Sequence, residues 1–285
     1  MKTALYLLRD AAKAFSEDNV SRLAAALAYY TLFSVAPLLV IAIGITGLVI
    51  GQGEAQTEIV AQIEAAAGPQ VAEALAGMID TVSRPGAGGR ATLIGILVLM
   101  WGASQVLTQL KDSFNTIWKV TPPPEAGIWL TIRQRLISLS MVLTVGFLML
   151  VSLIFSAAIA TLSQLLTETI PALRVALPLV DGISSVLLMT PLFALIFKSM
   201  PDTPLTWRDV AIGGVVTAVL FLLGKLLISF YLGYTGVASA YGAAGSLIVI
   251  LLWVYYSAQL LFFGAEITKV YTYQFGSRRP VPTDG

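Results

Sequence analysis

The sequence predicts an all-α fold, a polytopic integral membrane protein with six transmembrane helices, and three observations support this fold class. The chain contains six long apolar runs, and a helix needs about 20 apolar residues to cross the hydrocarbon core of a bilayer. Hydrophobic residues make up 57% of the 285 residues and charged residues only 12%, about half the share of a soluble domain. Few charges interrupt the runs, and helices satisfy their own backbone bonds where water is absent. The runs are Leu23–Ile50, Ala91–Leu110, Leu136–Leu162, Val175–Phe197, Val210–Leu232 and Ala243–Tyr271.

Residues 1–20 mix charged and apolar side chains and predict an amphipathic helix on the membrane surface. A helix whose apolar side chains share one face lies in the plane of the interface. No cleavage site follows the first apolar run, so we expect that run to stay as an uncleaved anchor. The apolar face would consist of Ala4, Leu5, Leu8, Ala12 and Phe15.

The longest external connection, residues 51–90, is predicted to form a helical hairpin on the outer leaflet or capping the bundle. Two apolar stripes are separated by Gly68 and Pro69, and proline suits the first turn of a new helix. Two interpretations stay open for this hairpin: a solvated connector with its apolar side on the bundle, or a mobile lid over an opening. The hairpin would belong to a single membrane domain over residues 1–273, followed by a disordered cytoplasmic tail over residues 274–285.

The distribution of lysine and arginine predicts the orientation. Six crossings put both termini on one side, and short cytoplasmic loops carry an excess of positive residues. The opposite side would carry only Arg84, Arg90 and Arg174, and Lys225 would lie inside the fifth run. All other lysines and arginines would lie on the side of the termini. We therefore expect both ends in the cytoplasm of a bacterium, with the chain in the inner membrane.

Polar residues inside the runs are the candidate functional residues. Gln105 of the second run shares one helical face with Asp112 and Asn115, which lie where the same helix is expected to continue to Trp118 and Lys119, and a polar face toward lipid is costly. Such residues either line a pathway or form hydrogen bonds between helices, and the sequence leaves both readings open. The residues of the candidate substrate pathway are Gln105, Asp112, Asn115, Lys225, Gln259 and Glu266.

Two of these residues are charged at depth and need partners. For Lys225 in the fifth run the predicted partner is Asp181, because both lie toward the outer side. Lys225 could instead extend its stem toward the outer headgroups. For Glu266, near the cytoplasmic end of the sixth run, the predicted partner is Arg22.

Small residues recur in the runs and predict close approach of helices. We interpret most of them as packing residues. They are Ala24–Ala26, Ala28, Gly213, Gly214, Gly224, Gly242 and Gly245.

The composition excludes several function classes. The chain contains no histidine and no cysteine, so the usual zinc and transition-metal ligands and the commonest general base are absent. No phosphate-binding G-x-x-x-x-G-K-[ST] motif occurs, and the net charge of +1 does not favour nucleic-acid binding. We expect a protein that is not an enzyme, with no metal, no cofactor and no nucleic-acid partner.

Three segments carry a resemblance to a known family. They are AAALAYYTLFSVAPLL (residues 24–39), the stretch with Asn115, Ile117 and Trp118, and YGAAGSLIVILLWVYYSAQLLFFGAEITKVY (residues 241–271). In order and spacing they resemble the YihY/BrkB family of bacterial inner-membrane proteins, which implies six membrane helices with cytoplasmic termini. Some family members have been called ribonuclease BN, but the scattered carboxylates and missing histidines of this chain argue against metal-dependent RNA cleavage.

Three functions fit these observations. The first is a transporter or translocase of a lipid or another amphiphilic envelope component, moved along a polar path between helices. The second is a non-catalytic membrane scaffold that holds envelope proteins. The third is a membrane enzyme acting on lipids through Asp112 and Glu266. The expected partners are membrane lipids and envelope proteins, and the oligomeric state is not predicted.

Overall fold

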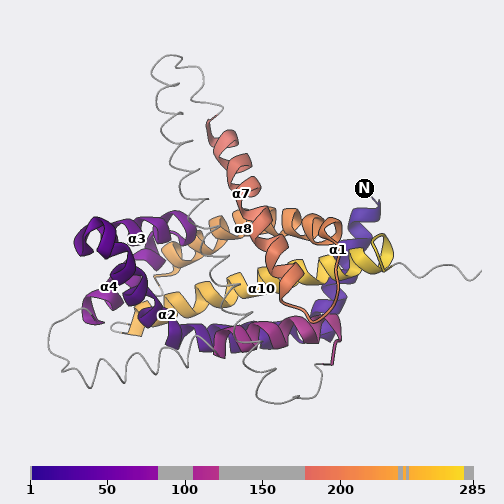
Figure 1. The fold of residues 1–285 in the computed structure, drawn as a ribbon, viewed down its shortest axis with the longest axis horizontal. Coiled ribbons are helices and arrows are strands. Elements are labelled where there is room, and N and C mark those ends of the chain that lie inside the picture. The colour runs from indigo at the N-terminus through magenta and orange to yellow at the C-terminus, as the bar shows by residue number, and fades with distance from the viewer. Residues whose placement is uncertain (1, 83–104, 122–176, 237–239, 242–243, 279–285) are drawn as a thin grey trace, which may run out of the picture. The chain divides into compact units, whose positions relative to one another are not determined.

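The computed structural model describes residues 2–82, 105–121, 177–236, 240–241 and 244–278 (Figure 1). Every regular element within these ranges is a helix, which confirms the predicted all-α class for this part of the chain. Residues 105–118 are also helical. The named helices are α1 (Lys2–Glu17), α2 (Val20–Ile50), α3 (Gln52–Ala67), α4 (Pro69–Val82), α7 (Leu177–Ser199), α8 (Trp207–Thr235) and α10 (Gly245–Gln274).

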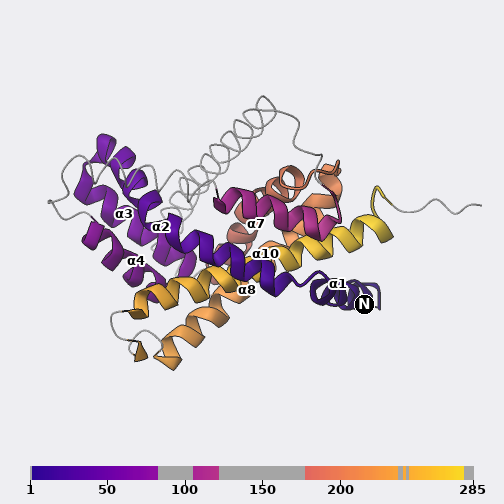
Figure 2. The same cartoon turned by 90° about the horizontal axis from the view of Figure 1, so that it is seen from below.

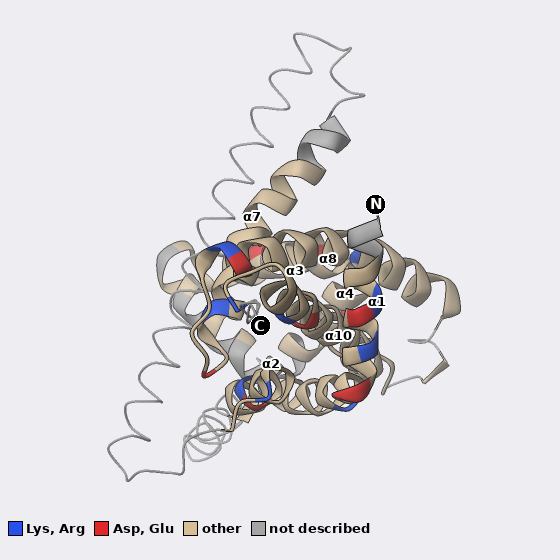
Figure 3. Cartoon of the chain, turned by 90° about the vertical axis from the view of Figure 1, so that its right-hand side faces the viewer, with Lys and Arg blue, Asp and Glu red and all other residues tan. Residues whose placement is uncertain are grey.

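Three of the described helices are long and apolar enough to cross a bilayer. These are Gly182–Ser199 within α7, all of α8 and all of α10, and they coincide with the last three predicted runs. Most of the described ribbon carries neither positive nor negative side chains (Figure 3). The run at residues 136–162 and most of the run at residues 91–110 lie outside the described residues, so the count of six spans stays a prediction.

The chain divides into two compact units. Unit 1 comprises Met1–Ala14, Phe114–Leu222 and Phe263–Gly285, and unit 2 comprises Phe15–Ser113 and Leu223–Phe262. The helices α8 and α10 are each divided between the two units, α8 after Leu222 and α10 after Phe262. The single membrane domain over residues 1–273 stays a prediction.

In unit 2, α3 folds back along the carboxyl-terminal half of α2 (Figure 2). The reversal occurs at Gly51, whose φ of 92° is a conformation that glycine adopts without strain. Because the chain reverses at this glycine, Ile43 of α2 packs with Ala55 of α3 and Ile79 of α4 in one small cluster. The predicted helical hairpin therefore exists, and it lies along α2 from the reversal onward.

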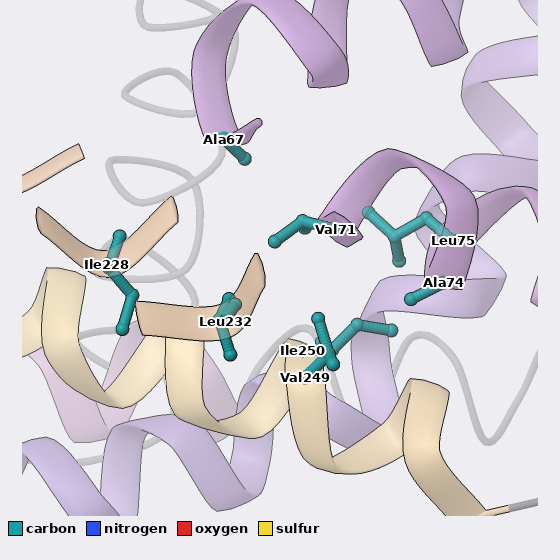
Figure 4. Close-up of a cluster of buried hydrophobic side chains, with 8 residues drawn as sticks. All are labelled: Ala67, Val71, Ala74, Leu75, Ile228, Leu232, Val249 and Ile250. Carbon is teal, nitrogen blue, oxygen red and sulfur yellow. The ribbon is translucent and has the colours of Figure 1, made fainter. Parts of the chain in front are cut away.

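A second cluster joins this hairpin to α8 and α10 (Figure 4). Partly buried Leu32 and Val35 of α2 pack against it. Val35 lies about 22 Å along the axis of α2 from its end at Ile50, at 1.5 Å per residue. The hairpin thus packs with the carboxyl-terminal part of α8 and the first turns of α10. The cluster consists of Ala67, Val71, Ala74, Leu75, Ile228, Leu232, Val249 and Ile250.

In unit 1, α8 and α10 run antiparallel in very close contact. A Cβ added to Gly213 would lie 1.8 Å from Thr268 Oγ1, and one added to Gly264 would lie 1.9 Å from Thr217 Oγ1. Each threonine hydroxyl donates to the carbonyl of the glycine four residues before it in its own helix, at 2.7 Å in both cases. Gly214 also approaches the backbone of α7, where a Cβ added to it would lie 2.8 Å from the carbonyl oxygen of Thr190. The predicted packing role is confirmed for Gly213 and Gly214, and also for Gly224, which contacts Tyr256 and Leu260 within unit 2.

The amino-terminal helix α1 is separated from α2 by Asn19, which has a left-handed φ of 51°. Within unit 1, Gln274 Nε2 at the end of α10 donates to Asp10 Oδ2 of α1 at 2.8 Å. Of the predicted apolar face, Leu8 is 44% exposed. A role for α1 on the membrane surface stays a prediction.

Candidate functional site at the elbow of the hairpin

The turn between α3 and α4 is built for a tight reversal. Gly68 has a φ of 93°, a left-handed value that residues with a side chain rarely adopt, and Pro69 starts α4. We call residues 65–71 the elbow: the last turn of α3, Gly68 and the first turn of α4. The sequence predicted this helix break at Gly68 and Pro69, and the structure confirms it.

The elbow packs on one face of α8, against three residues spaced four apart along that helix: Lys225, Ser229 and Gly233. Lys225 Nζ donates a hydrogen bond to the carbonyl oxygen of Ala65 in the last turn of α3. A Cβ on Gly68 would lie 2.5 Å from Ser229 Oγ, and a Cβ on Gly233 would lie 3.0 Å from Gln70 Nε2. The elbow therefore lies directly against the carboxyl-terminal part of α8.

The ammonium of Lys225 contacts the carboxyl-terminal end of α3. The last four carbonyls of a helix have no partner within it, and they carry the negative end of the helix dipole. Lys225 lies about 15 Å along the axis of α8 from its end at Thr235, so it meets α3 well inside the helix ends. The side chain of Asp181, the predicted partner, lies outside the described residues, so that pairing stays a prediction.

A first prediction concerns Gly68. The variant Gly68→Ala should destabilise the protein by roughly 2 kcal/mol, because it strains a left-handed position and drives a Cβ into Ser229 Oγ. Unfolding in mixed micelles with increasing dodecyl sulfate measures the loss. In the double variant Gly68→Ala/Ser229→Gly, the stability lost through the collision should be recovered, and the stability lost through backbone strain at residue 68 should not. Equal stability of Gly68→Ala and the wild-type protein would contradict this packing.

A separate polar network lies in unit 1, and it employs Asn115. Asn115 Nδ2 donates to Asp202 Oδ2 at 3.0 Å, and the backbone N–H of Asp202 donates back to Asn115 Oδ1 at 2.9 Å. Asn115 is only 3% exposed, so this reciprocal pair fixes the loop between α7 and α8 on the helix of residues 105–118. This contact joins the helix to a loop, so whether Asn115 bonds between helices or lines a pathway stays a prediction.

The start of α8 anchors the carboxyl-terminal segment through Asp209, which is 2% exposed. Its carboxylate accepts from Thr206 Oγ1 at 2.6 Å and from Ser277 Oγ at 2.5 Å. The guanidinium of Arg278 donates to Thr203 Oγ1 and to the carbonyl of Pro204. Residues 277–278 of the predicted tail are therefore held against the start of α8 within unit 1, and residues 279–285 lie outside the described part.

The other predicted residues have different surroundings. Glu266 is fully buried, and Lys269 Nζ lies 3.1 Å from Glu266 Oε2, one turn along α10. Its pairing with Arg22, a residue of unit 2, stays a prediction. Gln105 and Gln259 are partly buried in unit 2, and Asp112 is exposed there. Whether the predicted pathway residues line one path stays a prediction.

The family model described as "Virulence factor BrkB" matches residues 11–284, which is nearly the whole chain. The chain belongs to the BrkB family. The predicted resemblance is thereby confirmed, and it explains why three dispersed segments carried a single family signal.

Curated BrkB relatives are named as membrane proteins. A UPF0761 membrane protein of Pseudomonas aeruginosa (strain LESB58) is 29% identical over 266 residues, covering 91% of this chain and 61% of the relative. One from Alcanivorax borkumensis is 26% identical, covering 94% and 61%. One from Psychromonas ingrahamii is 25% identical, covering 88% and 82%. The chain thus spans about three fifths of the first two relatives, and no solved structure matches it significantly.

Sequence reasoning missed several residues of these sites in the BrkB chain. Ser229 follows Lys225 by one helical turn, so spacing on one face was the signal that could have found it. Gln70 follows the predicted break directly. No local signal pointed to Asp202, because its partner Asn115 is far away in sequence. In the described part of the chain no three acidic side chains gather where they could hold a metal ion.

Proposed function

We propose that this BrkB-family chain is a transporter or translocase of a lipid or another amphiphilic envelope component. It would act in the bacterial inner membrane, with six spans and both termini in the cytoplasm. The observation that carries the proposal is the cation of Lys225 at the elbow, inside a helix that is apolar enough to cross a bilayer. An ionisable residue at such depth marks a substrate or ion path by default.

Two features of unit 2 support movement of cargo past the elbow. The hairpin consists of two short helices, and a single glycine joins them. Short helices that end inside a bundle present their polar ends to a substrate in many transporters. The path would include Lys225 together with Gln105, Asp112 and Gln259 of the same unit.

The alternative is a non-catalytic scaffold for envelope proteins, and one observation favours it. Asn115 and Glu266 are both buried and are both held by fixed partners, Asp202 and Lys269. Polar side chains that are held by partners within the protein stabilise the fold and need not bind cargo. These two residues would then serve the fold, and the path would not pass them.

A second prediction tests translocation directly. Purified full-length protein is reconstituted in liposomes that contain a fluorescent phospholipid, and an impermeant quencher reports which leaflet holds the label. We expect the label to exchange between leaflets faster than in protein-free liposomes, and the variant Lys225→Met to lower the protein-dependent rate roughly tenfold. Exchange at the protein-free rate, for lipids of every headgroup, would favour the scaffold.

A further inference from the structure

The elbow gathers hydrogen-bond donors around one glycine. An ammonium has three N–H donors, and Lys225 uses one for the carbonyl of Ala65. The Ser229 hydroxyl is buried and has no hydrogen-bond partner among the described residues. The side-chain amide of Gln70 lies on the other side of the turn, with Oε1 3.8 Å from the Cβ position of Gly68. Lys225 thus bonds the last turn of α3, and the Ser229 hydroxyl and the Gln70 amide lie at the glycine that follows it.

The positive charge at the elbow has no acidic partner in the described part of the chain. The acidic residues that flank the elbow in sequence are Glu64 and Glu73. Both are exposed, and neither forms an ion pair with Lys225. A backbone carbonyl neutralises only part of an ammonium charge through the helix dipole. An ammonium with N–H groups beyond the one that bonds the carbonyl can also hold an anionic oxygen.

The ammonium is also open to the surroundings of the protein. Ala65, whose carbonyl it contacts, is exposed, and Lys225 itself is partly exposed. Leu226, at the next position of α8, is 63% exposed and apolar. A ligand that reaches Lys225 from outside the bundle would therefore meet a cation beside an apolar surface, a combination that suits an anionic headgroup with an acyl chain.

We propose that the elbow binds the headgroup of an anionic amphiphile, with Lys225 as its cation and the Gln70 amide as a neutral donor. A headgroup oxygen would take the free N–H groups of Lys225 beside the Ala65 carbonyl, and the apolar part would lie along α8 at Leu226. The inference rests on the proposed function, because it names the charge class of the cargo. A soluble anion such as phosphate lacks the apolar contact and is not the proposed occupant.

A third prediction tests this site by lipid binding, without any transport step. Full-length protein in detergent is titrated with dioleoyl phosphatidylglycerol and with dioleoyl phosphatidylcholine, and bound lipid is counted by native mass spectrometry. The wild-type protein should prefer the anionic lipid, Lys225→Met should bind it about tenfold more weakly, and Lys225→Arg should keep the preference. The matched control is Lys198→Met, which removes another ammonium that bonds a backbone carbonyl. Lys198→Met should leave the preference unchanged.

Two results would overturn the site: an unchanged preference in a folded Lys225→Met protein, or displacement of the lipid by millimolar inorganic phosphate. If Lys225→Met fails to fold, a photoactivatable phosphatidylglycerol bound to wild-type protein should label residues 52–82 or 223–235, and labelling only elsewhere rejects the site. If the lipid binds through Lys225 but no lipid crosses liposomes, the site stands and the translocase falls. If zwitterionic and anionic lipids cross equally in wild type and in Lys225→Met, the translocase stands and the site falls.

Discussion

The double variant Gly213→Ala/Gly264→Ala should unfold at much lower dodecyl sulfate concentration than the wild-type protein. Each new Cβ would lie under 2 Å from a threonine oxygen of the facing helix, so α8 and α10 must separate within unit 1. Overpacking of this kind costs about 1–3 kcal/mol at each site, and the two sites together should cost roughly 4 kcal/mol. Equilibrium unfolding in mixed micelles, followed by circular dichroism, measures the change.

A matched glycine provides the control for this fourth prediction. Gly53 in α3 has no neighbouring atom within 4 Å of its Cβ position, so Gly53→Ala should be neutral or stabilise by up to about 1 kcal/mol. Adding Thr268→Ala to Gly213→Ala removes the colliding hydroxyl and should recover part of the loss, which a double-mutant cycle detects as coupling. Wild-type stability of the double glycine variant would show that these helices do not approach so closely.

The contact between α8 and α10 also shows which part of the packing the sequence could supply. Gly213 was recognisable as a packing residue because small residues permit close approach. Its partner Thr268 was not, because nothing in α8 indicates which residue of another helix it meets. The threonines contribute because each hydroxyl is bonded within its own helix, so none of the hydroxyl groups at the contact is left unsatisfied.

The hairpin shows the same division between local and long-range information. The break at Gly68 and Pro69 was predictable because backbone preference is local. The apolar stripes of α3 and α4 indicated which faces are covered, but a stripe is equally apolar against a leaflet or a helix. That the elbow meets α8 at Ser229, inside the helix ends, depends on the length of α3 and on the sharp reversal at Gly51.

The sequence identified the charged residue of the candidate site but not the group that it contacts. Lys225 was conspicuous because a charge inside an apolar run is rare. An acidic partner was expected, yet the described contact is the backbone carbonyl of Ala65, which every residue possesses and no sequence pattern marks. The same holds for Asp202, whose side chain and backbone both bond Asn115.

The fifth prediction concerns Asp209, which holds the carboxyl-terminal segment on unit 1. Asp209→Ala should lower the free energy of unfolding by about 3 kcal/mol, because the hydroxyls of Thr206 and Ser277 lose a buried, charged acceptor. It should also let trypsin cleave after Arg278 faster, since the protease must take the guanidinium that Thr203 and Pro204 now hold. Mass spectrometry of the products over time measures the cleavage rate.

A graded series separates the network from a general loss of folding. Ser277→Ala removes one donor and leaves Asp209 bonded to Thr206, so it should accelerate cleavage while costing only about 1 kcal/mol. Replacing an exposed acid, as in Glu64→Ala, should change neither quantity. If Asp209→Ala has the same free energy of unfolding as the wild-type protein and is cleaved by trypsin no faster, the bonds of Asp209 do not hold the segment. The variant Arg278→Gln would then test whether the guanidinium contacts hold the segment.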